Sequence, residues 1–250
     1  MSVSVILAVH NGEAYVERCL KSISAQTFNN FEVIIVDDAS TDNSKALIEK
    51  FKTSLPELTF IENHENLGLT KSLNLGLKAA RRRYIARIDH DDAWPPDHLE
   101  AAVAFFDADP TMHLVGHNPY NPKDADVVQF KDIMCRNVFV HSSVLFKRLL
   151  LDSPIFYDEN LRYSQDHELW LRILKHGNGI ASASLEISET KDGANISVTR
   201  RRAQIACSLR ARFKHFSLSK ISFLQIYFFL KDLIRLLVPA PDKTRNLSLQ

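Results

Sequence analysis

Residues 3–38 read VSVILAVHNGEAYVERCLKSISAQTFNNFEVIIVDD, and this stretch decides the fold class. The run Val3–Val9 is apolar and rich in β-branched side chains, which predicts a buried strand that ends in a polar turn. Residues 13–26 have apolar side chains at helical spacing, and residues 31–36 form a second apolar run. A strand, a helix and a strand in this order predict neighbouring parallel strands joined by a crossover helix.

The first half of the chain continues this alternation, and the second half is less regular. We expect Ser40 or Thr41 to cap the helix that follows the second strand. The pattern predicts an α/β fold in which helices cover both faces of a mostly parallel sheet. The further elements expected are helices over 43–51, 69–80, 97–106 and 165–176, strands over 58–62 and 84–88, a strand or short buried segment over 138–146, and a Pro/Asn-rich connection over 114–129.

Polar clusters follow three of the expected strands. These are His10-Asn11, Asp37-Asp38 and the acidic segment Asp89–Asp92. In open parallel sheets, ligands bind beyond the carboxyl ends of the strands. The clusters are far apart in sequence, yet the topology brings them to one edge of the sheet. This convergence predicts a binding site there.

The segment Asp89-His90-Asp91-Asp92 holds three carboxylates within four residues. Their mutual repulsion is relieved by a hard divalent cation, and Mg²⁺ or Mn²⁺ prefers one or two carboxylates together with phosphate oxygens and water. Such an ion neutralises charge that develops on a phosphate leaving group. The alternative is a solvated acidic turn before the next helix; the position at a strand end favours the metal.

Asp37 and Asp38 also end a strand, where a carboxylate can accept hydrogen bonds from a ribose hydroxyl or a base N–H. The alternative is a local Asx turn or helix cap, and both roles can hold together.

The chain has neither a Gly-x-Gly-x-x-Gly nor a P-loop motif, so dinucleotide and P-loop binding are disfavoured. Phosphate charge is then expected to meet the metal and cations such as Arg87 or Lys71.

Asp166 lies at the start of the helix expected over 165–176. A carboxylate there can act as a general base if the fold brings it to the donor site. It can equally be an acid that the helix dipole stabilises, and the residues alone leave these two interpretations even.

Charge is unevenly distributed along the chain. The formal net charge is +1, yet from Arg200 onward there are eleven Lys/Arg and two Asp, a net charge of +9 that leaves −8 on residues 1–199. A basic and apolar tail points to an anionic surface as its partner.

The three cysteines fit neither a zinc site nor a disulfide framework, and no signal peptide is evident, so we expect a cytoplasmic protein with reduced thiols.

Residues 3–44 closely resemble the opening of glycosyltransferase family 2. The resemblance continues through further motifs in the expected order and covers roughly residues 3–197. It implies a GT-A fold, an α/β/α sandwich whose first half binds the nucleotide and whose second half receives the acceptor. The further matching motifs are Asn66–Leu69, Ser72–Asn74, Ala86–Asp92, Val140–Val144 and Asp166–Arg172.

The resemblance also implies roles for individual residues. Asp38 matches the acid that recognises the base, and Asp166 matches the catalytic base of inverting members. Asp89 and Asp91 match the Asp-x-Asp motif that binds Mn²⁺ or Mg²⁺, with Asp91 favoured over Asp89 as the direct ligand. The donor-binding set expected in full is Val9, His10, Asn11 and Glu13 around the base and ribose, with Asp38, Lys71, Arg87, Asp89 and His90.

The sequence departs from the family pattern at three places. His10 stands where Tyr is usual, and Gln165 replaces the acid that usually precedes the base. The stretch 190–197 resembles a family segment that usually carries Arg and His. Lys191 can replace that Arg, but the stretch has no His.

These observations predict an inverting transfer of a sugar from a nucleotide donor, UDP-linked by expectation, to a saccharide or lipid-linked saccharide in surface-polysaccharide assembly. Asp166 deprotonates the acceptor, and the metal site and Arg87 stabilise the departing diphosphate. His141 and Trp170 are candidates for sugar contacts or for core packing. The rivals are a non-catalytic nucleotide-sugar binder and a metal-dependent phosphohydrolase or nucleotidyltransferase.

The tail, residues 200–250, is expected to be a basic amphipathic helical unit that follows a GT-A domain over 1–199, with a nucleotide-binding half (1–92) and an acceptor half (93–199). Its apolar run is too short to span a bilayer. An interfacial helix on an anionic membrane, peripheral at the inner face of the plasma membrane, is weighed against a helix packed on protein. Nucleic acid is not expected as a partner. Polar residues on one arc of the helix over 216–238 are Lys220, Gln225, Lys231, Asp232 and Arg235.

Overall fold

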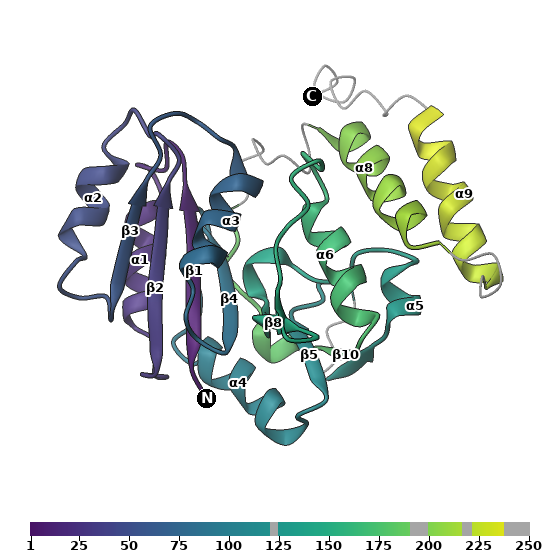
Figure 1. The fold of residues 1–250 in the computed structure, drawn as a ribbon, viewed down its shortest axis with the longest axis horizontal. Coiled ribbons are helices and arrows are strands. Elements are labelled where there is room, and N and C mark those ends of the chain that lie inside the picture. The colour runs from purple at the N-terminus through teal and green to yellow at the C-terminus, as the bar shows by residue number, and fades with distance from the viewer. Residues whose placement is uncertain (121–124, 191–199, 217–221, 238–250) are drawn as a thin grey trace, which may run out of the picture.

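The computed structural model describes residues 1–120, 125–190, 200–216 and 222–237. The chain builds an eight-stranded sheet in the order β3-β2-β1-β4-β7-β5-β10-β6. Figure 1 shows the first four of these strands on one side of the molecule and the C-terminal helices α8 and α9 on the other. The N-terminus lies near α4, at the end of the sheet where β1 begins.

The four N-terminal strands are parallel, as predicted. All residues of β1 (Val3–Val9) and β2 (Phe31–Asp37) are buried, because helices cover both faces of the sheet. The outer neighbours are β3 (Leu58–Glu62) and β4 (Tyr84–Asp89). The connecting helices are α1 (Val16–Ser24), α2 (Ser44–Lys50) and α3 (Leu69–Ala79).

The second half inserts an antiparallel strand into the sheet. Strand β7 (Leu145–Lys147) runs antiparallel to both β4 and β5 (Met112–Gly116). Since two reversals cancel, β5 points the same way as β4, and β10 (Asn178–Ala181) pairs with β5 in parallel. The carboxyl ends of β1, β2, β4, β5 and β10 therefore share one edge of the sheet, and β7 begins at that edge.

Several sequence predictions, most of them for the second half, need correction. The segment 114–129 is not simply a connection, because it overlaps β5 and contains β6 (Asp126–Val128), which pairs antiparallel with β10. These strands are only five and three residues long, so they lack the long apolar runs that mark β1 and β2. The segment 138–146 contains a 3₁₀ turn, η1 (His141–Ser143), before β7 begins. Asn43, rather than Ser40 or Thr41, occupies the N-cap position of α2.

The remaining short elements connect the sheet strands. Helix α4 (His98–Ala108) and helix α6 (Gln165–Leu174) confirm the two helices predicted for this half. The others are α5 (Phe130–Ile133), a hairpin of β8 (Leu149–Leu150) and β9 (Ser153–Pro154), and η2 (Ala183–Leu185).

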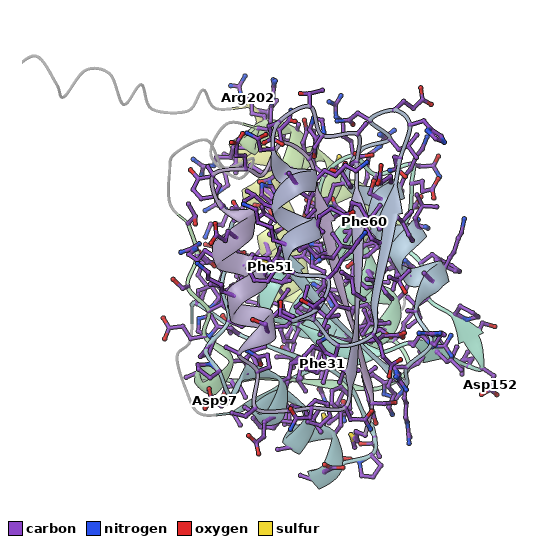
Figure 2. The ribbon with its side chains drawn as sticks, turned by 90° about the vertical axis from the view of Figure 1, so that its left-hand side faces the viewer. Phe31, Phe51, Phe60, Asp97, Asp152 and Arg202 are labelled. Atoms are coloured by element: carbon purple, nitrogen blue, oxygen red, sulfur yellow. The ribbon has the colours of Figure 1, made fainter. Side chains whose placement is uncertain are left out.

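The apolar core consists of one layer on each face of the sheet. Helices α1 and α4 pack on one face, and α3 and α6 pack on the other. Helix α3 approaches β1 so closely that a Cβ added to Gly76 would lie 2.6 Å from Ile6 Cγ2, which explains a glycine inside this helix. In Figure 2, Phe31 and Asp97 mark the end of the molecule where β2 begins, and Arg202 lies at the opposite end.

The C-terminal helices are attached in series to the second half of the sheet domain. Helix α8 (Arg201–Lys214) contacts α6, and α9 (Phe223–Leu237) contacts α8. Buried Glu168 of α6 accepts from Lys214 Nζ and pairs with His215 Nε2, each at 3.2 Å. The predicted helix over 216–238 therefore begins later, at Phe223, and Lys220 lies outside the described residues. Among the residues that the structure describes, no helix is long and apolar enough to cross a membrane.

Candidate functional site

The loop after β1 is joined by hydrogen bonds to the loop after β2. His10 Nδ1 donates to the Asp38 carbonyl at 2.8 Å, and Asn11 Oδ1 accepts from the Thr41 backbone N–H at 2.8 Å. Glu13 accepts from the Asn43 side chain at 2.6 Å. Three of the residues expected to hold the base and ribose thus lie together and are exposed at the carboxyl edge of the sheet.

Gly12 brings this loop against the acidic segment. A Cβ built on Gly12 would lie 2.7 Å from Cδ2 of His90, so only glycine lets the imidazole approach the backbone here. Val9 lies beneath the loop, with its side chain buried, and its carbonyl accepts from the Asp38 N–H at 2.7 Å. The end of β1 therefore contacts both the Asp38 segment and the Asp89 segment.

The Asp38 carboxylate is held by donors from a third loop. It accepts from Asn63 Nδ2 and from the backbone N–H groups of Leu67 and Gly68, each at 2.8 Å. Burial raises the pKa of Asp38, but these hydrogen bonds outweigh it and leave the pKa below its usual range. Asp38 is therefore an ionised carboxylate that fixes the turn leading into α3, beside the exposed residues of the β1 loop.

Asp89 is paired with Arg87 at the end of β4. The guanidinium donates through both Nη atoms to the two carboxylate oxygens, and Arg87 is only 1% exposed. Buried Ser142 adds a third contact: its hydroxyl donates to Asp89 Oδ2 and accepts from the Asp89 N–H, both at 3.0 Å. Loss of solvent raises the pKa of Asp89, but the charge of Arg87 outweighs this and holds the pKa below its usual range.

This pairing limits what Arg87 can do. We expected its guanidinium to meet phosphate, and the structure instead directs it to Asp89 in the interior. The other expected cation, Lys71, is exposed on α3. A charge-neutralised Asp89 remains an oriented oxygen ligand, because Arg87 and Ser142 hold the carboxylate from behind.

Asp91 and Asp92 complete a group of three carboxylates with Asp89. One oxygen from each residue lies within 4.8 Å of the others, a spacing that suits a single divalent ion. Burial raises the pKa of Asp92 to about 6, and burial followed by the charge of Asp89 raises that of Asp91. Both shifts reflect negative charge that lacks sufficient compensation, so these residues fit a cation. Asp92 was not among the metal ligands predicted from sequence.

Arg18 is a cation at the same place that the sequence pattern did not reveal. It lies on α1, and its Nη2 donates to the Asp91 carbonyl and to Thr190 Oγ1. Thr190 Oγ1 in turn donates to the Asp91 carbonyl. The side chain of Arg18 is exposed, in contrast to that of Arg87. The residues 191–197, which include Lys191, lie outside the described residues.

Asp166 lies in the first turn of α6 and accepts from Asn137 Nδ2 at 2.7 Å. Burial raises the pKa of Asp166, while a backbone N–H and the nearby charge of Arg87 act in the opposite direction. Asn137 lies five residues before Ser142, whose hydroxyl donates to Asp89, so one short segment contacts both Asp166 and Asp89. A carboxylate with a raised pKa at such a position is suited to accept a proton. Asn137 was missed because a lone Asn in a loop carries no distinguishing pattern.

The two aromatic candidates for sugar contacts differ in the structure. Trp170 is completely buried and packs edge-on against Phe146, so it is a core residue and contacts no sugar. His141 is partly exposed, and its Nε2 pairs with the Tyr157 hydroxyl at 2.8 Å. Burial, and then the charge of Arg87, hold the pKa of His141 well below its usual range, so this imidazole is neutral.

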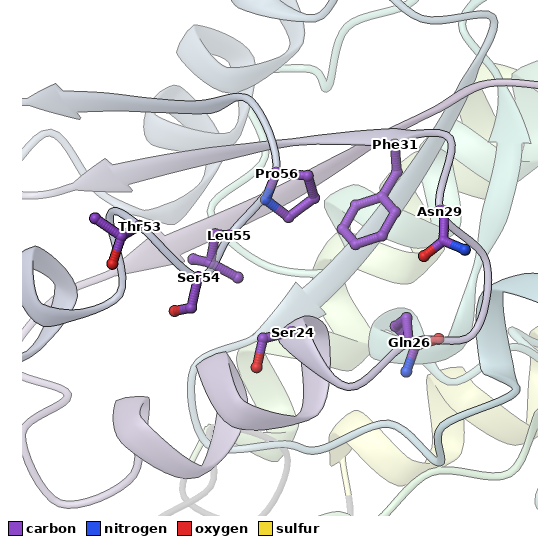
Figure 3. Close-up of a pocket in the computed structure, with 8 residues that line it drawn as sticks. All are labelled: Ser24, Gln26, Asn29, Phe31, Thr53, Ser54, Leu55 and Pro56. Carbon is purple, nitrogen blue, oxygen red and sulfur yellow. The ribbon is translucent and has the colours of Figure 1, made fainter.

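Two hollows in the surface lie outside this set of residues. Figure 3 shows a cavity of about 270 Å³ between the end of α1 and the start of β2, lined by residues such as Gln26 and Phe31. It lies at the amino ends of the strands, opposite to the carboxyl edge. A second hollow, of about 510 Å³, is lined in part by residues that come directly after the acidic segment in the sequence, such as Trp94, and by residues near Ser188. Neither is lined by a site residue predicted from sequence.

Comparison with known proteins identifies the family. The model of the family described as "Glycosyl transferase family 2" matches residues 4–170. The chain belongs to glycosyltransferase family 2. This glycosyltransferase is 28% identical over 254 residues to the amylovoran biosynthesis glycosyltransferase AmsE of Erwinia amylovora, with 94% of each chain covered. It is 27% identical over 197 residues to the poly(ribitol-phosphate) β-N-acetylglucosaminyltransferase TarS of Staphylococcus aureus, covering 74% of this chain and 34% of TarS.

Solved structures share the GT-A fold. The crystal structure of TarS residues 1–349 with UDP matches with a TM-score of 0.73 at 20% identity, over 100% of this chain and 76% of that one. The mannosyltransferase PcManGT of Pyrobaculum calidifontis, with GDP-Man and Mn²⁺, has a TM-score of 0.73 at 20% identity over 94% and 71%. The glycosyltransferase spans 61% of an uncharacterized relative from Haemophilus influenzae and about a third of TarS. By their names, the relatives AmsE and TarS act in the synthesis of amylovoran and on poly(ribitol-phosphate), so the relatives include enzymes of polysaccharide biosynthesis.

Proposed function

We propose that this glycosyltransferase moves a sugar from a nucleoside-diphosphate donor, a UDP-sugar by preference, to a saccharide or lipid-linked saccharide acceptor. The transfer inverts the anomeric configuration, requires Mn²⁺ or Mg²⁺, and serves the assembly of a surface polysaccharide. The names of AmsE and TarS support the pathway class. Neighbours with UDP, UDP-GlcNAc, or GDP-Man and Mn²⁺ support the donor and the metal.

One observation carries the proposal. Three carboxylates, Asp89, Asp91 and Asp92, gather within 4.8 Å at the carboxyl edge of the sheet. A fourth, Asp166, lies in the first turn of α6 and is bonded to Asn137, whose segment also supplies the Ser142 contact to Asp89. The first group suits a divalent ion bound to a diphosphate, and the separate carboxylate suits proton transfer. Two acidic centres with different environments are what a displacement at an anomeric carbon requires.

The residues act as follows in the proposed reaction. His10, Asn11 and Glu13 offer exposed polar groups to the base and ribose, and Asp38 holds the adjoining turn. Asp91 and Asp92, with Asp89 oriented by Arg87 and Ser142, would hold the metal. A divalent ion there would supply positive charge to the leaving diphosphate.

Proton transfer falls to Asp166. Its carboxylate takes the proton from the acceptor hydroxyl as that oxygen attacks the anomeric carbon on the face opposite the nucleotide. Asn137 orients the carboxylate through the 2.7 Å hydrogen bond to Oδ2. Because one displacement forms the new bond as the old one breaks, the configuration inverts.

The cation that meets the diphosphate is proposed to be Arg18 rather than Arg87. Arg87 is buried and occupied by Asp89, whereas Arg18 is exposed and lies against the Asp91 backbone. Lys71 on α3 remains a second candidate. We further propose that the enzyme is peripheral at the inner face of the plasma membrane, where a lipid-linked acceptor would be found.

The experiment that tests the donor and the metal is a thermal-shift measurement with UDP, GDP and dTDP, each in Mn²⁺ and in EDTA. A ligand that binds only the folded state raises the melting temperature. We expect a shift with UDP that needs Mn²⁺. Absence of a metal-dependent shift with every nucleotide would refute the proposal. Release of UDP from UDP-sugars only when a saccharide acceptor is present would exclude the hydrolase and the non-catalytic binder.

A further inference from the structure

Helix α9 turns its apolar side outward. Large apolar side chains cover the face away from α8: Phe223 is 86% exposed, Ile234 59% and Leu237 77%. A surface helix of a globular protein normally buries its apolar stripe against the core. The other exposed apolar residues of this face are Leu224, Ile226, Tyr227, Leu230 and Leu233.

The inner side of α9 carries half-buried Asp232, Phe229 and Leu236, and Arg235 is exposed beside them. Asp232 accepts from the buried guanidinium of Arg212 in α8 at 2.5 Å, and Arg235 Nη1 donates to the other Asp232 oxygen at 3.3 Å. Phe229, also on the inner side, lies 6.5 Å from Phe216 between ring centroids. The ion pair therefore fixes the rotation of α9 about its axis, and the apolar face is directed outward as a consequence.

The position of α9 leaves this face accessible. Figure 1 shows α9 as the outermost helix on its side of the molecule, separated from the sheet by α8 and α6. Its 15 residues have a length of about 22 Å at 1.5 Å per residue, which is shorter than the hydrocarbon core of a bilayer. An apolar surface of this kind marks contact with another molecule or with a membrane, and a helix of this length suits a position along the membrane plane.

Charge decides between these partners. Helices α8 and α9 carry seven Lys/Arg and one acidic residue, Asp232. Arg212, Lys214 and Arg235 already form ion pairs with carboxylates, which leaves Arg201, Arg202, Arg210 and Lys231 as the uncompensated cations of the two helices. A second copy docked on this face about a twofold axis would bring the two sets of cations together. An anionic lipid surface would attract them instead. Lys231 Nζ lies 5.8 Å from the ring centroid of Tyr227 and 5.6 Å from that of Phe228, a combination of cation and aromatic rings that suits a membrane interface.

We propose that the outer face of α9 is the surface by which the enzyme docks on anionic lipid, with the helix lying in the headgroup layer and α8 as the link to the catalytic half. This inference deepens the membrane association proposed above, but it does not depend on donor or metal binding. Helix α6, which α8 contacts, carries Asp166 in its first turn. Docking through α9 therefore places the catalytic half close to lipid-linked acceptors.

The test is co-sedimentation of the full chain with vesicles. Vesicles of phosphatidylcholine and phosphatidylglycerol in equal parts are compared with pure phosphatidylcholine. We expect binding to the anionic vesicles that weakens at high salt. The double variant Leu230→Glu/Ile234→Glu is expected to bind at least about tenfold more weakly, because it adds two negative charges to the face. Both positions are exposed, so folding is retained, which circular dichroism and urea unfolding verify.

Val127→Glu is the matched control. Val127 is a 60% exposed apolar residue on edge strand β6, so the variant makes the same kind of change far from α9 in the sequence, and we expect it to bind as the wild type does. Wild-type protein that ignores anionic vesicles, or a double variant that binds them equally well, would overturn the proposal. A wild-type dimer in sedimentation velocity that the double variant dissolves, without vesicle binding, would show that a second copy covers α9. Vesicle binding without any nucleotide binding would instead refute the proposed donor and leave this inference standing.

Discussion

Asn137→Ala tests the proposed catalytic base through one hydrogen bond. Asn137 Nδ2 donates to Asp166 Oδ2 at 2.7 Å, and a donor to the ionised carboxylate lowers the pKa of Asp166. Removing it therefore raises that pKa further. A hydrogen bond to a charged group contributes about 1.5–3 kcal/mol. Since Asp166 is partly exposed and water can replace part of the bond, we expect about 1.5 kcal/mol, or a tenfold change in the protonation equilibrium.

The consequence appears in the pH dependence of the reaction. Asp166 must be ionised to accept a proton, so activity is present above its pKa and is lost as the pH falls through it. In the variant this loss begins at higher pH. We expect UDP release in the presence of acceptor to fall about tenfold on the acidic side and to recover at alkaline pH. Titration of the Asp166 carboxyl by ¹³C NMR measures the same change without acceptor.

Asn160→Ala is the control for this measurement. Asn160 Nδ2 donates to Asp158 at 2.9 Å in a similar bond that does not involve Asp166. We expect this variant to keep the wild-type pH profile, and both variants to keep the wild-type affinity for UDP. If the activity of Asn137→Ala is lost at the same acidic pH as that of the wild type, then either Asn137 does not lower the pKa of Asp166 or Asp166 is not the base.

Four further predictions concern the same site. Asp91→Ala abolishes metal-dependent donor binding; equal UDP affinity with Mn²⁺ and with EDTA, measured by calorimetry, would contradict it. Asp166→Asn leaves UDP binding intact and removes transfer, and near-normal transfer would move the base elsewhere. Arg18→Ala weakens binding of UDP about tenfold but not of uridine, since only UDP carries the diphosphate charge; Lys21→Ala, on the same helix, is the control. Mn²⁺ affinity falls as the pH drops through about 6, because protonation of Asp92 competes with the ion; a flat calorimetric profile would exclude Asp92 as a ligand.

The parallel half of the fold was predictable because its elements have strong local patterns. Strands β1 and β2 are seven-residue apolar runs, and each is followed by polar residues where a parallel sheet places its binding edge. Strands β6 and β7 were harder because three residues are too few to produce a periodic pattern. Strand β7 also enters the sheet between strands that precede it in the chain, and nothing in its own residues specifies this.

In the candidate site, too, some residues could be recognised from local sequence and others only from tertiary contacts. The family motifs identified the acidic residues, because carboxylates after a strand are visible in one dimension. They did not indicate that Arg87 would be buried against Asp89, since that outcome needs Ser142, 53 residues away, to close the contact. Arg18 and Asn137 were missed for the same reason. Each is an ordinary polar residue until the fold brings it to Asp91 or Asp166.

The tail makes the difference clearest. Composition showed that residues 200–250 are basic, and the spacing of polar and apolar residues predicted an amphipathic helix there. Which face of that helix points outward was decided by the tertiary structure, through the ion pair between Arg212 and Asp232. Hydrophobic periodicity depends on neighbours within a few turns of the chain, so the sequence by itself determines where helices and strands form. The partners of a charged side chain depend on segments that meet only after folding, and these contacts decided the surroundings of the three clustered carboxylates, the partner of Asp166 and the outer surface of α9.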